Sequence, residues 1–177
     1  RHTRYISVTG VQTCALPISL DNDIIEYLED NLILLHTNKG RSANDILLNQ
    51  SNRMIDNEKS FNNVKQMVEL AEQFKIDLKN KNLEFFGEML DYSWQLKKEI
   101  SNDISNLEID EFYEEAKLCG AKAGKILGAG GGGFMLLYAD KFAQIKIREV
   151  FKNHKPFNFK FDFQGSVVSK KIGRAHV

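Results

Sequence analysis

The stretch GKILGAGGGGFMLLYA, from Gly124 to Ala139, places four consecutive glycines directly before an apolar run. Half of the chain's 12 glycines lie between Gly124 and Gly133, so the glycines reflect a requirement of this one segment and not a glycine-rich composition. Glycine loses more backbone freedom on folding than any other residue, and proteins use it where φ must be positive or where a Cβ atom would block a close approach. The apolar run that follows predicts a buried strand.

The order of the elements around the glycines excludes two familiar phosphate-binding motifs. The spacing predicts a helix, then a loop from Gly128 to Gly133, then a strand. A dinucleotide-binding fingerprint instead follows a strand and opens a helix, and a P-loop continues into Gly-Lys-Ser or Gly-Lys-Thr, where this chain has Phe134. Two interpretations remain: a nest of backbone N–H groups around an anion, and a tight turn that needs positive φ. One or two glycines satisfy a turn, so four favour the nest.

Apolar spacing in the rest of the chain predicts an α+β fold, a small antiparallel sheet covered by helices on one face. An apolar run at 30–37 has the length of a strand. The segment FNFKFDF at 157–163 alternates strictly, which is typical of a half-buried antiparallel strand. Helices are predicted after a cap at Ser42 or Asn44, over 61–78, from 83 to 100, over 109–116 and after a cap at Asp140.

Two of these helices carry more specific expectations. Ser105 and Glu108 have the spacing of a capping box, which would start the helix over 109–116. Gly120 is expected to end the same helix in a left-handed conformation. In the helix from 83 to 100, the expected buried face carries Phe85, Met89, Tyr92, Leu96 and Ile100.

Length and composition are those of one globular domain. The chain has 177 residues, 42% of them hydrophobic and 27% charged, which is enough for a sizeable core. The formal net charge is zero, which argues against a nucleic-acid or anionic-membrane partner for the chain as a whole, and no apolar run reaches the roughly 20 residues of a membrane span. Two cysteines and a start that is unlike a signal peptide predict a cytoplasmic protein.

Both ends of the chain are expected to be foreign to the domain. The first residues, RHTRYISVTGVQTCALPIS, resemble the conceptual translation of a short-read sequencing adapter, and KIGRAHV at the end resembles the opposite adapter. We therefore expect a non-native leader at 1–19, one native domain at 20–170 and a non-native tail at 171–177. An ordinary variable terminus is the alternative.

The segment GAKAGKILGAGGGGFMLLY resembles the third motif of GHMP kinases, the superfamily of galactokinase, homoserine, mevalonate and phosphomevalonate kinases. The match spans Gly120 to Gly133. HTNKGRSANDIL is similar to a strand and helix of the same C-terminal domain. YSWQLKKEISNDISNLEIDEFYEEA resembles the D-glycero-D-manno-heptose 7-phosphate kinase branch, whereas mevalonate kinases tend to carry Asn-His in place of Ser93 and Trp94.

The resemblance implies the C-terminal domain, of ferredoxin-like fold, of a kinase whose N-terminal domain is missing here. It implies that the full-length parent uses ATP and Mg²⁺ to phosphorylate the anomeric hydroxyl of a heptose 7-phosphate for capsule or other surface-polysaccharide synthesis. The family's ATP loop and catalytic Asp lie in the missing half, so the fragment alone is expected to be inactive. The alternatives are a fucose, galactose or mevalonate type of kinase, or a non-catalytic ligand-binding module. No spacing of His, Cys, Asp and Glu predicts a protein metal cage.

The candidate site residues follow from the resemblance and from residue chemistry. Arg41, at a helix start, is suited to bind a sugar phosphate, with a surface ion pair as its alternative. Trp94 is expected to stack on a sugar or to pack against the glycine loop. Lys125 faces phosphate or stays solvated, and Lys97 and Lys98 are expected on a solvated helix face. The candidates are Gly128, Ala129, Gly130, Gly131, Gly132 and Gly133 beside the nucleotide phosphates, and Thr37, Arg41, Ser42, Trp94 and Lys125 for the substrate.

Overall fold

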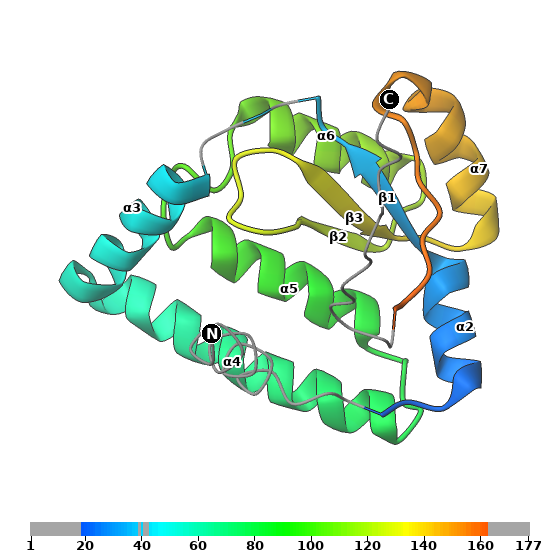
Figure 1. Cartoon of the computed structure of the whole chain (residues 1–177), viewed down its shortest axis with the longest axis horizontal. Helices are drawn as coiled ribbons and strands as arrows, with labels where there is room; N and C mark the ends of the chain where they lie inside the picture. Colours follow the sequence, from blue (N-terminus) through cyan, green and yellow to red (C-terminus); the bar gives the residue numbers. More distant parts are fainter. Residues whose placement is uncertain (1–18, 39, 41–42, 163–177) are drawn as a thin grey trace, which may run out of the picture.

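A computed structural model describes residues 19–38, 40 and 43–162, and Figure 1 shows a small antiparallel sheet surrounded by helices. The sheet has three strands in the order β1-β3-β2, and the described residues also form six α-helices and a short 3-10 helix. The predicted α+β class with a small antiparallel sheet is therefore confirmed. The elements are α2 (Asn22–Asn31), β1 (Leu32–His36), α3 (Ala43–Asp56), α4 (Glu58–Lys79), α5 (Phe86–Lys98), α6 (Leu107–Leu118), β2 (Ala123–Ile126), β3 (Phe134–Tyr138), α7 (Lys141–Val150) and η1 (Lys152–His154).

The glycine loop joins two strands, so the predicted order of helix, loop and strand is wrong. β2 lies between α6 and the loop and pairs antiparallel with β3, with Ala123 opposite Tyr138 and Ile126 opposite Met135. β2 has only four residues, too few for a clear alternation of apolar and polar positions. Within it, Gly124 lets the two strands approach closely, because an added Cβ would lie 2.7 Å from the carbonyl oxygen of Leu136.

The core lies mainly on one face of the sheet. Ile33 and Leu35 from β1 and Met135 and Leu137 from β3 are fully buried there, against α5, α6 and α7. The opposite face is covered as well, but only at one end, where α2 and the end of α4 pack in a second cluster. Toward the glycine loop this second face is open, and Phe134 keeps 39% of its surface exposed. Helices therefore cover more than the single face that was expected.

Helix α6 starts with a different cap from the predicted one. The Asn106 side chain accepts a hydrogen bond from the Ile109 N–H at 3.0 Å, while the Ser105 hydroxyl donates to Asp110 at 2.9 Å. The predicted capping box at Ser105 is thus wrong by one residue. The predicted end is confirmed: Gly120 has φ of 105° and lies just beyond the C-cap, as in a Schellman motif.

The predicted strand at 157–163 is wrong within the described residues. Only Phe157 pairs with the sheet, in an isolated bridge to Leu34, with N–O distances of 2.8 and 3.3 Å. Residues 158–162 have no strand structure, and Phe163 lies outside the described residues. The alternating phenylalanines instead contact other rings, as Phe157 does with Phe134 at 5.7 Å. No described helix is both long enough and apolar enough to cross a bilayer.

Candidate functional site

The turn between β2 and β3 is built from residues 127–133, and it projects from the sheet toward α3 and the end of α5 (Figure 1). All five of its glycines have positive φ: 75° at Gly128, 111° at Gly130, 72° at Gly131, 149° at Gly132 and 90° at Gly133. Residues other than glycine rarely adopt these φ angles, because their Cβ atom would come too close to the following carbonyl oxygen. The backbone path therefore accounts for every glycine in the turn.

Three neighbouring segments hold this glycine loop in place. The loop preceding α6 approaches most closely: the Gly131 N–H donates to the Ile104 carbonyl at 2.8 Å, and a Cβ at Gly130 would lie 2.9 Å from the same oxygen. At the far end, the Thr37 N–H and hydroxyl both donate to the Gly133 carbonyl, at 2.8 and 3.0 Å. From α3, the Gln50 amide donates to the Ala129 carbonyl at 2.7 Å. The loop is thus fixed through the Gly131 N–H and through the carbonyl groups of Ala129 and Gly133.

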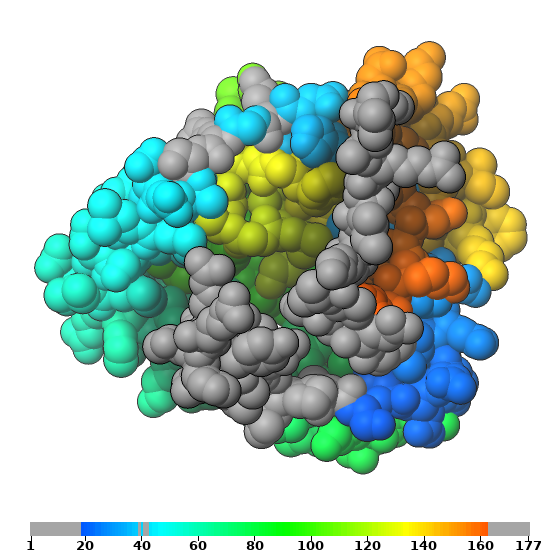
Figure 2. Space-filling model, viewed as in Figure 1, coloured from blue at the N-terminus to red at the C-terminus, as the bar shows by residue number. Residues whose placement is uncertain are grey.

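The residues of the loop differ in exposure: Gly128 is exposed, whereas Gly130 and Gly131 are buried. Apart from the Gly131 N–H, the N–H groups between 128 and 133 donate to no acceptor among the residues that the structure describes. Atoms of the β2–β3 hairpin, coloured yellow, reach the surface beside α3 in Figure 2. An anion-binding nest forms where successive residues pair a right-handed with a left-handed conformation, so that their N–H groups converge. The positive φ angles agree with the turn interpretation, and an anion-binding role of the loop stays a prediction.

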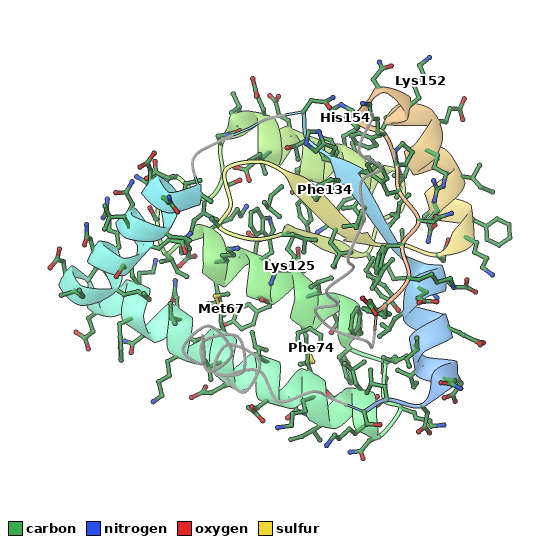
Figure 3. All side chains as sticks on the ribbon, in the orientation of Figure 1. Met67, Phe74, Lys125, Phe134, Lys152 and His154 are labelled. Atoms are coloured by element: carbon green, nitrogen blue, oxygen red, sulfur yellow. The ribbon has the colours of Figure 1, made fainter. Side chains whose placement is uncertain are left out.

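Two lysines lie beside the loop. Lys97, near the end of α5, is half-buried and its Nζ donates to the Gly128 carbonyl. Lys125, on β2, is also half-buried and lies on the face of the sheet that carries Phe134; both residues are labelled in Figure 3. Burial, and to a smaller extent the like charge of Lys125, lower the pKa of Lys97 to about 8. Burial also lowers the pKa of Lys125.

Lys97 and Lys98 are both half-buried, so the expectation that both lie on a solvated helix face is wrong. Helical periodicity places Lys97 on the polar side of α5, and its partner Gly128 is 31 residues away, so no local pattern reveals the contact. Lys98 behaves differently, because it pairs with Asp110 at 3.2 Å and lies 6.0 Å from the centre of the Trp94 ring. Adjacent lysines thus have different environments.

The remaining candidates do not gather at one place. Trp94 is fully buried in the main core, which rules out direct contact with a sugar and agrees with the packing alternative. Its indole N–H has no acceptor among the described residues. Thr37 is buried and uses its hydroxyl to hold the glycine loop. Arg41 and Ser42 lie outside the described residues, so their roles stay predictions.

A cavity of about 350 Å³ lies at the end of β1, next to Thr37. Three glutamates of α6 contribute to its wall, and His154, labelled in Figure 3, lines the other side. Carboxylates repel a phosphate group, so this cavity is unsuited to one. The wall residues are Thr37, Asn38, Glu108, Ile109, Glu111, Phe112, Glu115, Phe151 and His154.

The low pKa of Lys97 has a measurable consequence for stability. At pH values between about 8, the pKa of Lys97 in the folded chain, and 10.5, the pKa of an unperturbed lysine, the unfolded chain keeps a proton on this residue that the folded chain has released. Stability rises with pH wherever the unfolded state binds more protons, so the free energy of unfolding should gain from Lys97 across this window. Urea denaturation of wild type and of Lys97→Gln as a function of pH measures this. We expect a smaller rise in Lys97→Gln and an unchanged one in Lys98→Gln; equal pH slopes in all three proteins would refute the assignment.

Comparison with known proteins adds information that the geometry lacks. Residues 74–156 match the family described as GHMP kinases C terminal. The chain is 31% identical over 147 residues to a D-glycero-alpha-D-manno-heptose 7-phosphate kinase of Campylobacter jejuni, in a match that covers 83% of this chain and 43% of the relative. It is 26% identical over 147 residues to a bifunctional fucokinase/GDP-fucose pyrophosphorylase of Arabidopsis thaliana, covering 82% of this chain and 14% of the relative.

A solved structure agrees with these relatives. A putative sugar kinase from Campylobacter jejuni superposes with a TM-score of 0.58 at 28% identity, over 83% of this chain and 41% of the other. The chain therefore spans less than half the length of the relatives to which it is similar.

Proposed function

Since this chain belongs to the GHMP kinase family through its C-terminal domain, matched over residues 74–156, we propose that it is part of an ATP-dependent sugar-phosphate kinase. The proposed substrate is D-glycero-D-manno-heptose 7-phosphate, phosphorylated at its anomeric hydroxyl. The resemblance of the segment from Tyr92 to Ala116 to the heptose branch and the Campylobacter relative support this substrate. The product would serve surface-polysaccharide synthesis.

The observation that carries the proposal is the glycine loop with its free N–H groups, beside two lysines. Phosphoryl transfer requires little covalent chemistry from the protein and depends on positioning and on stabilising the charge of the phosphate oxygens. Backbone N–H groups and ammonium groups supply both. In the proposed enzyme the loop forms one wall of a cleft, and the missing N-terminal domain forms the other.

The residues beside the loop suit the phosphate part of ATP, because two of them are lysines. The loop offers donors and two cations to phosphate oxygens, whereas the described residues contain no group of three or more His, Cys, Asp or Glu that could hold a metal. Mg²⁺ binds ATP through its phosphate oxygens and usually keeps several waters. ATP supplies the phosphoryl group, and this domain's role is to orient the phosphates and exclude water from one side.

Two alternatives are tested by the same experiment. The fucokinase relative favours a fucose type of kinase as the second candidate, and a non-catalytic binding module is the third. The gene that continues upstream of this chain should encode a Gly-Leu-Gly-Ser-Ser segment, and the enzyme made from it should phosphorylate heptose 7-phosphate with MgATP. Fucose, galactose and mevalonate serve as comparison substrates, and the 177-residue chain alone as the inactive control. Turnover by the chain alone, or a better rate with fucose, would contradict the proposal.

A further inference from the structure

Helices α3 and α4 meet at a corner on the edge of the molecule (Figure 1), and a groove of about 740 Å³ with a mostly apolar lining lies at this corner. Ile55 and Phe61 in the groove keep 80% and 58% of their surface exposed, and Val68, further along α4, keeps 59%. Apolar residues that gather at one exposed place, unlike single ones, mark a surface that binds another molecule. The groove is lined by Ser51, Met54, Ile55, Asp56, Glu58, Phe61 and Val64.

The fold itself cannot cover this groove, because the inner side of α4 is fixed against α5 and its C-terminal end. Ser60 and Asn63 are buried there. The Ser60 hydroxyl donates to the Ile100 carbonyl at 3.2 Å, and the Asn63 amide donates to the Leu96 carbonyl at 3.4 Å. Rotation of α4 about its axis would break these hydrogen bonds and leave buried polar groups unsatisfied. Phe61 therefore stays exposed in a single copy of the chain.

The outer side of α4 carries charges of both signs at matching positions. Glu58 and Lys65 are exposed and lie seven residues apart, which places them on the same side of the helix. Neither has an ion-pair partner among the residues that the structure describes. Phe61 lies between them. When α4 pairs antiparallel with an identical helix about a two-fold axis near Phe61, Glu58 of each copy faces Lys65 of the other. This surface is therefore complementary to itself.

We infer that the outer side of α4, with the groove beside α3, binds a second copy of this chain, so that two copies form a symmetric dimer through antiparallel α4 helices. This dimer goes beyond the proposed function and does not depend on it. The formal net charge of the chain is zero, so no net charge drives two copies apart.

The contact surface is small, which sets the strength of the dimer. The segment from Glu58 to Val68 spans roughly 16 Å along a helix about 10 Å wide. Even with the exposed side of α3, this area is below the roughly 800 Å² that each partner buries in a typical stable complex. The dimer is therefore expected to be weak and to form only at micromolar or higher concentrations.

The missing N-terminal half of the parent is the other molecule that could cover this surface. In the proposed enzyme that half faces the glycine loop, which α3 contacts through Gln50. Ile55 follows Gln50 by five residues, which turns its side chain by about 140° around the helix axis. The groove therefore opens on a different side of α3 from the loop, and this favours a second copy as its occupant.

The test is sedimentation of the 177-residue chain over a range from micromolar to near-millimolar concentration. The wild type should change from monomer to dimer as its concentration rises. Phe61→Ser should weaken the dimer by about tenfold or more, because it removes an apolar contact at the centre of the interface from both copies. Ile76→Ser is the matched control, since Ile76 is also half-exposed on α4 but lies outside the groove, and it should dimerise like wild type. Circular dichroism of both variants should match that of the wild type, because neither side chain belongs to the buried core.

Exchanged charges test whether the partner is a second copy in the antiparallel orientation. Glu58→Lys and Lys65→Glu should each dimerise more weakly than wild type, because like charges then meet twice across the two-fold axis. An equimolar mixture of the two variants should form a mixed dimer that is stronger than either variant forms alone, since each charge again faces its opposite.

A wild-type chain that stays monomeric at every concentration would overturn the inference. Equal weakening by Phe61→Ser and Ile76→Ser, or a mixture that associates no better than its separate components, would overturn it as well. If the 177-residue chain dimerises but the full-length parent does not, the missing half covers the groove in the parent, and a second copy is the wrong occupant.

Discussion

Replacing Gly130 with alanine is expected to lower the free energy of unfolding by about 3 kcal/mol, the sum of left-handed strain and overpacking. Gly130 has φ of 111°, and an added Cβ would lie 2.9 Å from the Ile104 carbonyl oxygen and 3.0 Å from its Cα. Both contacts involve backbone, which cannot rotate away as a flexible side chain does. The glycine loop and the segment before α6 would have to separate.

Gly128→Ala is the matched control for this prediction. Gly128 also has positive φ, 75°, but a Cβ there meets nothing within 4 Å. The free energy of unfolding of Gly128→Ala should therefore fall only by the cost of the left-handed conformation, about 1–2 kcal/mol. Urea denaturation of both variants, with the slope of the transition compared as well as its midpoint, separates the two effects. Equal losses at Gly128 and Gly130 would mean that the close approach to Ile104 contributes nothing.

In the full-length enzyme, Gly133→Val should reduce kcat by about 100-fold, the scale on which a misplacement of about 1 Å affects catalysis. An added Cβ at Gly133 meets no atom within 4 Å in this domain, so the side chain would enter the open space beside the loop. If phosphate occupies that space, the side chain blocks it. The backbone strain at φ of 90° should lower stability by only about 1–2 kcal/mol.

Gly120→Ala provides the control for a stability effect alone. Gly120 has φ of 105°, lies just after α6, and its Cβ would lie 2.9 Å from the Cβ of Ala143 in α7. This variant should be at least as destabilised as Gly133→Val yet retain normal kcat below its melting temperature. Normal kcat in Gly133→Val would show that the loop glycines only form a turn.

Positions set by local patterns could be predicted from the sequence. The apolar run after the glycines forms β3, Asp140 caps α7 by accepting from the Ala143 N–H, and Gly120 ends α6. The buried face of α6 was predicted correctly as well, and its residues are Ile109, Phe112, Tyr113 and Ala116. These features depend on residues within a few positions of one another, so single-sequence reasoning reaches them.

Features that depend on distant partners could not be predicted. Phe85 and Tyr92 were expected on the buried face of α5 but are about half exposed, because the strand β2 packs against a different side of this helix. The strict alternation at 157–163 predicts a strand, yet a strand also needs a partner along its length, and β1 offers one only at Leu34. Lys97 is half-buried, and its Nζ contacts the Gly128 carbonyl, 31 residues away in the sequence.

The candidate site was predictable in part for the same reason. The need for positive φ in the loop follows from the glycines themselves and is met at every one of them. The segments that hold the loop come from β1, α3 and the region before α6, and their approach depends on the whole fold. The role of the loop in phosphate binding stays a proposal.

The most direct test of the account is the ratio of kcat/KM for heptose 7-phosphate to that for the same heptose without phosphate, measured with the full-length enzyme and MgATP. Binding energy from a remote phosphate positions the anomeric hydroxyl, and two charge-assisted contacts correspond to a ratio of about 100 or more. We expect the phosphorylated sugar to be preferred by that factor. A ratio near one, or a higher kcat/KM for fucose, galactose or mevalonate, would contradict the account.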